Sequence, residues 1–84
     1  MKKSRIPVAP IDRIIREIGA ERVSIDAVER LCDILEEMAI KIALIALQAS
    51  KHAGRKTVRK EDIDFALREI ANISLKSLIS KIEE

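Results

Sequence analysis

Residues 24–53 form one long stretch without glycine or proline. Apolar residues recur along it at alternating intervals of three and four, the spacing that places side chains on one face of a helix. This seam consists of Val28, Leu31, Leu35, Met38, Ile42, Ile45 and Ala49. The pattern predicts a helix of roughly 28 residues, about 42 Å long at 1.5 Å per residue.

A shorter amphipathic helix is expected before the long one. Pro10 suits the first helical position, and Gly19 suits a left-handed cap at the helix end. The apolar face of this helix would consist of Ile11, Ile14, Ile15 and Ile18. Ser24 then caps the long helix through its hydroxyl, and Asp26 complements the positive helix end.

A third helix is expected to start near Lys60, because Glu61 and Asp62 suit a first helical turn. Its buried face would consist of Ile63, Ala66, Leu67 and Ile70. The stretch from Asn72 to Ser74 offers a break. Beyond it, a fourth amphipathic helix is expected from the spacing of Leu75, Leu78, Ile79 and Ile82. An unbroken extension of the third helix is the alternative.

The seam is too long to be covered by two short helices of the same chain. A chain of 84 residues is one domain, and folds of this size bury only about 60% of their unfolded surface. We therefore expect an all-α homodimer in which two long helices cross. The alternative, a monomeric three-helix bundle, would leave much of the seam in water. The single cysteine, Cys32, excludes an internal disulfide and fits a reducing, intracellular compartment.

Cationic side chains are concentrated between the long helix and the third helix. The ten residues Lys51–Lys60 hold five cations and no acid, Arg59 and Lys60 among them. Helix starts and Lys or Arg side chains are the usual sources of contacts to duplex phosphates. The net charge is only +2, so the distribution matters more than the total. Ordinary solvated surface is the alternative for any single cation, but the cluster makes nucleic acid the leading partner.

The composition argues against most other functions. The chain has one histidine and one cysteine, lacks tyrosine and tryptophan, and has no glycine-rich phosphate loop or metal-ligand spacing. Cys32 and His52 would lie about 30 Å apart on one helix, so we expect no enzyme, cofactor, metal or small-molecule substrate. With so few aromatics, base stacking on RNA or single strands is disfavoured.

The sequence shows no membrane segment. The apolar run Met38–Ala49 is too short to span a bilayer, and no signal peptide is recognisable. We therefore expect a soluble cytoplasmic protein without membrane contact.

Several stretches between Ile6 and Ile70, about four fifths of the chain, resemble archaeal histones. They are Ala9-Pro10-Ile11, Arg13-Ile14-Ile15, Gly19-Ala20-Glu21-Arg22-Val23-Ser24, Ile34-Leu35-Glu36-Glu37-Met38, His52-Ala53-Gly54-Arg55-Lys56-Thr57 and Glu61-Asp62-Ile63. The resemblance implies a histone fold, in which helix, loop, long helix, loop and helix pair as a handshake dimer. It also implies compaction of double-stranded DNA without strong sequence preference, on the chromosome, by the protein itself or together with other histones.

The resemblance assigns roles to individual residues. Arg13 matches an arginine near the minor groove, and Arg16 a neighbouring basic position. Arg22 and Thr57 match an arginine and threonine pair that meets across the dimer, and Lys56 a phosphate-binding lysine. A further match is the intrachain ion pair of Arg55 with Asp62, which is structural. The predicted DNA contacts are therefore Arg13, Arg16, Arg22, Lys56, Thr57, Arg59 and Lys60.

Two departures from the family concern assembly. Dimers in the family stack through positions equivalent to Ala49, His52, Asp62 and Phe65, but here Ala49 is smaller and Phe65 larger than usual. His52 is either part of that interface or a surface residue near the helix dipole. A second apolar stripe, Ile40, Leu44 and Leu47, lies about half a turn from the seam. We expect the C-terminal helix to cover this stripe. The covering helix belongs either to the same chain, as a lid, or to another dimer, which gives a tetramer. We favour the tetramer.

These observations divide the chain into three parts: a basic N-terminal arm at residues 1–8, a histone fold at 9–71 and a helical extension at 72–84. Lys2, Lys3 and Arg5 are expected to be a flexible part of the arm. The competing function is that of a regulatory histone-fold subunit, which pairs with a different chain and acts through protein contacts. The extra helix and the low net charge favour that alternative.

Overall fold

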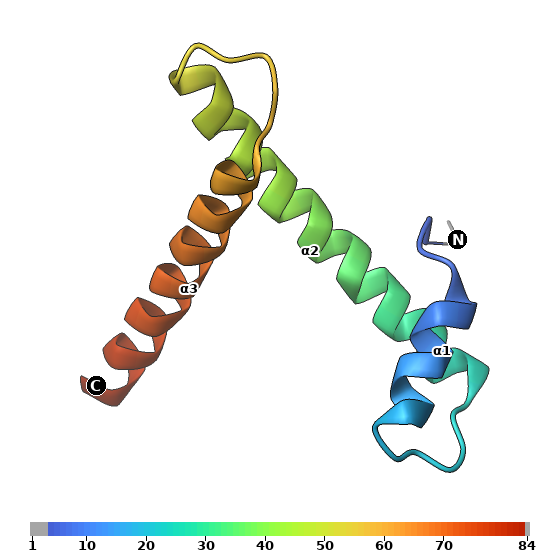
Figure 1. Ribbon diagram of the computed structural model, residues 1–84. Coiled ribbons are helices and arrows are strands. Elements are labelled where there is room, and N and C mark those ends of the chain that lie inside the picture. Colours follow the sequence, from blue (N-terminus) through green and yellow to red (C-terminus); the bar gives the residue numbers. More distant parts are fainter. Residues whose placement is uncertain (1–3, 84) are drawn as a thin grey trace. The chain divides into compact units, whose positions relative to one another are not determined.

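The computed structural model describes the backbone of residues 4–83 and the side chains of residues 4–72. It contains three helices, α1 (Val8–Glu17), α2 (Ile25–His52) and α3 (Lys60–Glu83) (Figure 1). Residues 4–83 include no strand. The all-α class and the order of short, long and further helix are confirmed. Two compact units, Met1–Ala39 and Ile40–Glu84, divide the chain within α2.

In the first unit, α1 starts two residues earlier than the sequence predicted. Pro7, with φ −63° and ψ 142°, precedes the first helical residue, so Pro10 lies inside the first turn. The first N–H groups of a helix have no carbonyl partner within it, and proline therefore removes no hydrogen bond there. The prediction that Pro10 opens the helix was wrong, because proline is tolerated at several positions of a first turn.

The loop between α1 and α2 is bounded by two predicted caps. Gly19 has φ +120°, its N–H donates to the Arg16 carbonyl at 3.0 Å, and the Ala20 N–H donates to the Ile15 carbonyl at 3.3 Å. These are the two hydrogen bonds of a Schellman motif. At the start of α2, the Ala27 N–H donates to the Ser24 hydroxyl at 3.1 Å. Both caps are confirmed.

The segment before α1 is attached to α2. The Ser4 hydroxyl donates to the Cys32 carbonyl at 3.1 Å, and the Arg5 side chain forms an ion pair with Glu36. The Cys32 thiol lies 3.9 Å from the Pro7 carbonyl and is oriented to donate to it. Arg5 therefore has a partner on α2, but the ion pair is exposed and worth about 0–1 kcal/mol, so the flexibility of the arm stays a prediction. Lys2 and Lys3 lie outside the described residues.

In the second unit, α2 ends in a second Schellman motif. Gly54 has φ +73°, its N–H donates to the Lys51 carbonyl at 2.9 Å, and the Arg55 N–H donates to the Ser50 carbonyl at 3.0 Å. Ala46 of α2 and Ala66 of α3 are both fully buried. Small buried side chains of this kind leave room for close packing between helices.

The third helix continues through the predicted break. It runs without interruption for 24 residues, about 36 Å at 1.5 Å per residue. Asn72 and Ser74 have only modestly lower helix propensity than alanine, and the helix contains neither glycine nor proline. The C-terminal helical extension is therefore confirmed, as the second half of α3 and not as a separate fourth helix.

Few side chains of the single chain are buried. Among the described residues, the fully buried apolar ones are Val28, Cys32, Ala46 and Ala66. Most of the seam on α2 is only half-buried, and Met38 is 49% exposed. The second stripe is more open, with Ile40, Leu44 and Leu47 at 45%, 55% and 40% exposure. Both apolar faces of α2 therefore remain available for contacts with other chains.

Candidate nucleic-acid interface

The loop between α2 and α3, residues 53–59, is held by an ion pair beneath it. Arg55 Nη1 donates to Asp62 Oδ2 at 2.8 Å, and Arg55 Nη2 donates to Asp62 Oδ1 at 2.8 Å. Asp62 is only 4% exposed. Arg55 therefore links the loop to the first turn of α3, and its guanidinium is occupied inside the protein.

Asp62 also caps α3. Its Oδ2 accepts a hydrogen bond from the Arg59 N–H at 2.8 Å, so the side chain of the third helical residue reaches back to the residue before the helix. The hydrogen bonds from Arg55 and then from the Arg59 backbone lower the pKa of Asp62 to about 2. The hydrogen bond between the Arg55 and Asp62 side chains raises the pKa of Arg55. Both groups remain charged at neutral pH.

Ser50 is the residue of this site that sequence reasoning missed. It lies in the last turn of α2 and is 1% exposed. Its hydroxyl lies 2.9 Å from the Thr57 carbonyl and 3.2 Å from the Arg55 carbonyl. The Thr57 carbonyl also accepts a hydrogen bond from Arg55 Nη1 at 3.0 Å. The signal available in the sequence for this site was a serine on a helix face whose other residues, before Gly54, are small and apolar.

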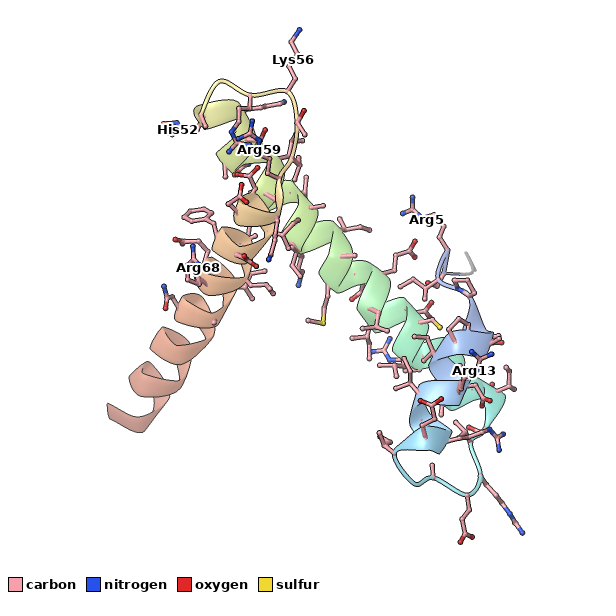
Figure 2. All side chains as sticks on the ribbon, in the orientation of Figure 1. Arg5, Arg13, His52, Lys56, Arg59 and Arg68 are labelled. Carbon is pink, nitrogen blue, oxygen red and sulfur yellow. The ribbon has the colours of Figure 1, made fainter. Side chains whose placement is uncertain are left out.

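Around the contacts made by Ser50, Arg55 and Asp62, the predicted DNA-contact residues of the second unit are exposed. They are Lys56, Thr57, Arg59 and Lys60. Lys56 extends from the loop away from the helices (Figure 2). The loop therefore combines a fixed backbone with outward cations, which suits contact with phosphates.

The other predicted cations belong to the first unit. Arg13 and Arg16 are exposed on α1, and Arg22 is exposed in the loop that follows. Arg16 Nε donates to Asp12 Oδ2 at 2.9 Å, one helical turn earlier. Exposed ion pairs of this kind are worth about 0–1 kcal/mol, so Arg16 can exchange Asp12 for a phosphate at little cost. The predicted meeting of Arg22 with Thr57 involves a second chain and stays a prediction.

The residues predicted for contacts between dimers fall in three places. His52, Asp62 and Phe65 line an open hollow of about 560 Å³, together with Ile45, Gln48 and Ala49. Ile40, Leu44 and Leu47 form the exposed stripe on α2. The side chains of Leu75, Leu78, Ile79 and Ile82 lie outside the described residues. In the hollow, both carboxylate oxygens of Asp62 already accept hydrogen bonds from its own chain, so a donor from another chain at this place would have to share them.

Neither a metal site nor a membrane span is found in the part of the chain that the structure describes. Its His, Cys, Asp and Glu side chains nowhere gather in a group of three or more that could hold a metal ion. None of its helices combines the length and apolar character needed to cross a membrane.

Known proteins share most of this sequence. Residues 4–67 match the family described as "Histone-like transcription factor (CBF/NF-Y) and archaeal histone". The chain is 51% identical over 65 residues to an archaeal histone HAN1 subunit from Thermococcus zilligii, covering 77% of this chain and 97% of that protein. It is 46% identical to probable archaeal histone 3 of Methanocaldococcus jannaschii over 65 residues, with the same coverage of both chains.

A more distant relative is the DNA-binding protein HmvA of Methanocaldococcus jannaschii. Its identity is 34% over 58 residues, which cover 69% of this chain and 60% of HmvA. The matched family region begins at the segment attached to α2, includes α1 and α2, and ends within α3. The chain belongs to the family of archaeal histones and histone-like transcription factors.

Proposed function

We propose that this protein binds double-stranded DNA without sequence preference and compacts it on the chromosome of a cell without a nucleus. Membership of the archaeal histone family supports DNA binding and association between histone chains. The observation that carries the proposal is the locked loop 53–59, in which Arg55 and Asp62 hold the backbone while Lys56 extends outward (Figure 2). Contacts of this type read charge and backbone shape, and they depend little on base identity.

The binding unit in this proposal is a homodimer. The half-buried seam on α2 and the small core of Val28, Cys32, Ala46 and Ala66 support pairing through the long helix.

In the dimer, two copies of each cationic group would contact one duplex. Arg22, Lys56, Thr57, Arg59 and Lys60 would bind phosphates from the loops and the start of α3. Arg13 would approach the minor groove from α1, with Arg16 beside it. All of these residues are exposed. The fixed backbone of the second loop supports this arrangement, because a preordered contact loses less entropy on binding.

Two dimers would then join into a tetramer through the stripe of Ile40, Leu44 and Leu47 and the C-terminal half of α3. A lid formed by the same chain requires a reversal near Asn72–Ser74, and the unbroken α3 (Figure 1) supports contact with another dimer instead. By light scattering, the full protein should contain four chains and a chain cut after Ala71 should contain two. The same number of chains in both would reject a tetramer joined through the C-terminal half of α3 and leave the dimer unaffected.

A regulatory subunit that pairs with a different chain is the second candidate. The matched family includes histone-like transcription factors as well as archaeal histones, and the net charge is only +2. The protein purified alone separates the two functions. A stable homodimer that shifts random duplexes supports the DNA-compacting function, whereas a chain that folds only with another histone-fold protein supports the regulatory one.

The DNA face is tested by changing Arg22 and Lys56 to alanine together. Each dimer then loses four predicted phosphate contacts, and the slope of log affinity against log salt should fall by about 3 to 4. The loss should be the same for unrelated duplexes. Arg30→Ala with Lys41→Ala is the matched control, because both cations are exposed on α2 outside the predicted contacts. Equal behaviour of the two double variants would reject the assigned face.

A further inference from the structure

We propose that Ser50 is a positioning residue for DNA binding. Its buried hydroxyl fixes the backbone on both sides of Lys56, so that this lysine meets the phosphate backbone in one orientation. The inference rests on the proposed function and adds to it a residue that is not itself a cation and does not reach the surface.

The two hydrogen-bond acceptors of Ser50 flank Lys56. The hydroxyl lies 3.2 Å from the Arg55 carbonyl and 2.9 Å from the Thr57 carbonyl. A serine hydroxyl has one proton, so the two carbonyls share it and are drawn to the same point on α2. The backbone is therefore fixed on both sides of Lys56, while the Lys56 side chain points outward (Figure 2).

Other contacts attach the loop at its two ends. The Ser50 carbonyl accepts a hydrogen bond from the Arg55 N–H at 3.0 Å, so Ser50 binds Arg55 with both its backbone and its side chain. Arg55 in turn donates to the Thr57 carbonyl at 3.0 Å and to Asp62 at 2.8 Å. The hydroxyl of Ser50 is thus the link between α2 and the middle of the loop, and Arg55 is the link between the loop and α3.

Loss of the hydroxyl alone should leave the fold in place. Alanine has a high helix propensity, fits the space of serine, and leaves the Arg55–Asp62 ion pair untouched. The Thr57 carbonyl keeps its hydrogen bond from Arg55, whereas the Arg55 carbonyl loses the Ser50 donor. The loop can then move relative to α2, and Lys56 must be ordered when DNA binds, which lowers affinity.

The test is a double-mutant cycle with Ser50→Ala and Lys56→Ala, using fluorescence anisotropy on a labelled random duplex. Ser50→Ala should weaken binding by about 3- to 10-fold, the effect of one hydrogen bond. In the Lys56→Ala background the same change should have less than about a 2-fold effect, because Ser50 acts through Lys56. Ser4→Ala is the matched control, since it removes a hydroxyl bonded to the Cys32 carbonyl at 3.1 Å in the other unit. Its effect should not depend on Lys56.

A second pair of variants separates the hydroxyl from packing. Ser50→Thr and Ser50→Val have nearly the same shape and differ in the hydroxyl, so the threonine variant should bind DNA more tightly than the valine variant by a similar 3- to 10-fold factor. This comparison holds even if the alanine variant fails to fold.

Each outcome of these experiments decides the inference. Equal affinities of the threonine and valine variants, or a Ser50→Ala effect that is the same with and without Lys56, would overturn the role of Ser50 and leave DNA binding intact. A protein that binds no duplex, or in which Lys56→Ala has no effect, would reject the proposed DNA face itself.

Discussion

The guanidinium of Arg55 and the carboxylate of Asp62 face each other through two hydrogen bonds of 2.8 Å each. Arg55 lies in the loop that follows α2, and Asp62 lies in the first turn of α3. This ion pair connects the two elements that surround the predicted phosphate contacts, so its properties govern how the loop responds to pH and to mutation.

Acid should destabilise the protein partly through Asp62. Its carboxyl has a pKa of about 2 in the folded protein and an ordinary value of 3.8. Between these values the unfolded chain binds the proton more readily, so the stability that Asp62 contributes above about pH 4 is lost as the pH falls towards 2. Asp62→Asn should be less stable at neutral pH and should lose less stability over that window. Urea unfolding at pH 5 and pH 2.5 measures the difference.

The control for this prediction is Asp64→Asn, at an exposed position of the same helix. It should lose stability with acid in parallel with the wild type. The role of Asp62 would be contradicted if Asp62→Asn and the wild type lost equal stability between the two pH values.

A side chain at Gly54 should destabilise the cap at the end of α2. Gly54 has φ +73°, and a Cβ atom there would meet nothing within 4 Å. The cost of Gly54→Ala is therefore that of the left-handed backbone alone, about 1–2 kcal/mol of unfolding free energy. Ala53→Gly, one residue earlier, should cost less than about 1 kcal/mol. Thermal unfolding at matched concentration checks both, and equal losses would contradict the cap.

Asp12 should weaken DNA binding by holding Arg16. The two side chains are 2.9 Å apart, and a phosphate must compete with the carboxylate for the guanidinium. Asp12→Asn should therefore raise affinity by about 2- to 5-fold, in line with an exposed ion pair. Glu17→Gln removes an acid from the same helix outside that pair and should raise affinity less. If both variants gave the same increase, only net charge would be involved.

A charge in the stripe on α2 should dissociate the proposed tetramer. Leu44 is 55% exposed in the single chain, and a buried carboxylate in an apolar contact is strongly unfavourable. Leu44→Glu should reduce the mass measured by light scattering from four chains to two. Ala27→Glu, at another exposed position of α2, should leave the mass unchanged. A Leu44→Glu tetramer would show that the stripe lies outside the interface.

Features that depend on neighbouring residues could be predicted from the sequence. The Ser24 cap, the glycine caps at Gly19 and Gly54 and the long α2 follow from helix chemistry within a few residues. The start of α1 and the continuation of α3 could not, because proline in a first turn and Asn or Ser inside a helix are both tolerated at low cost.

Side-chain contacts between residues more than one helical turn apart were harder to predict. The Arg55–Asp62 ion pair follows from resemblance to the family, but nothing in the local sequence of Ser50 reveals the two carbonyls that its hydroxyl binds. The same holds for Arg5, whose partner Glu36 lies 31 residues away. A cation near a chain terminus has no local signal for such a partner.

DNA binding without sequence preference is tested most directly by the affinity of the purified protein for two short duplexes of unrelated sequence, measured by anisotropy over a range of salt concentrations. We expect dissociation constants that agree within about 3-fold, with a slope of log affinity against log salt that reflects several phosphate contacts. Binding to one duplex alone, or no binding at low salt by a well-folded dimer, would contradict it.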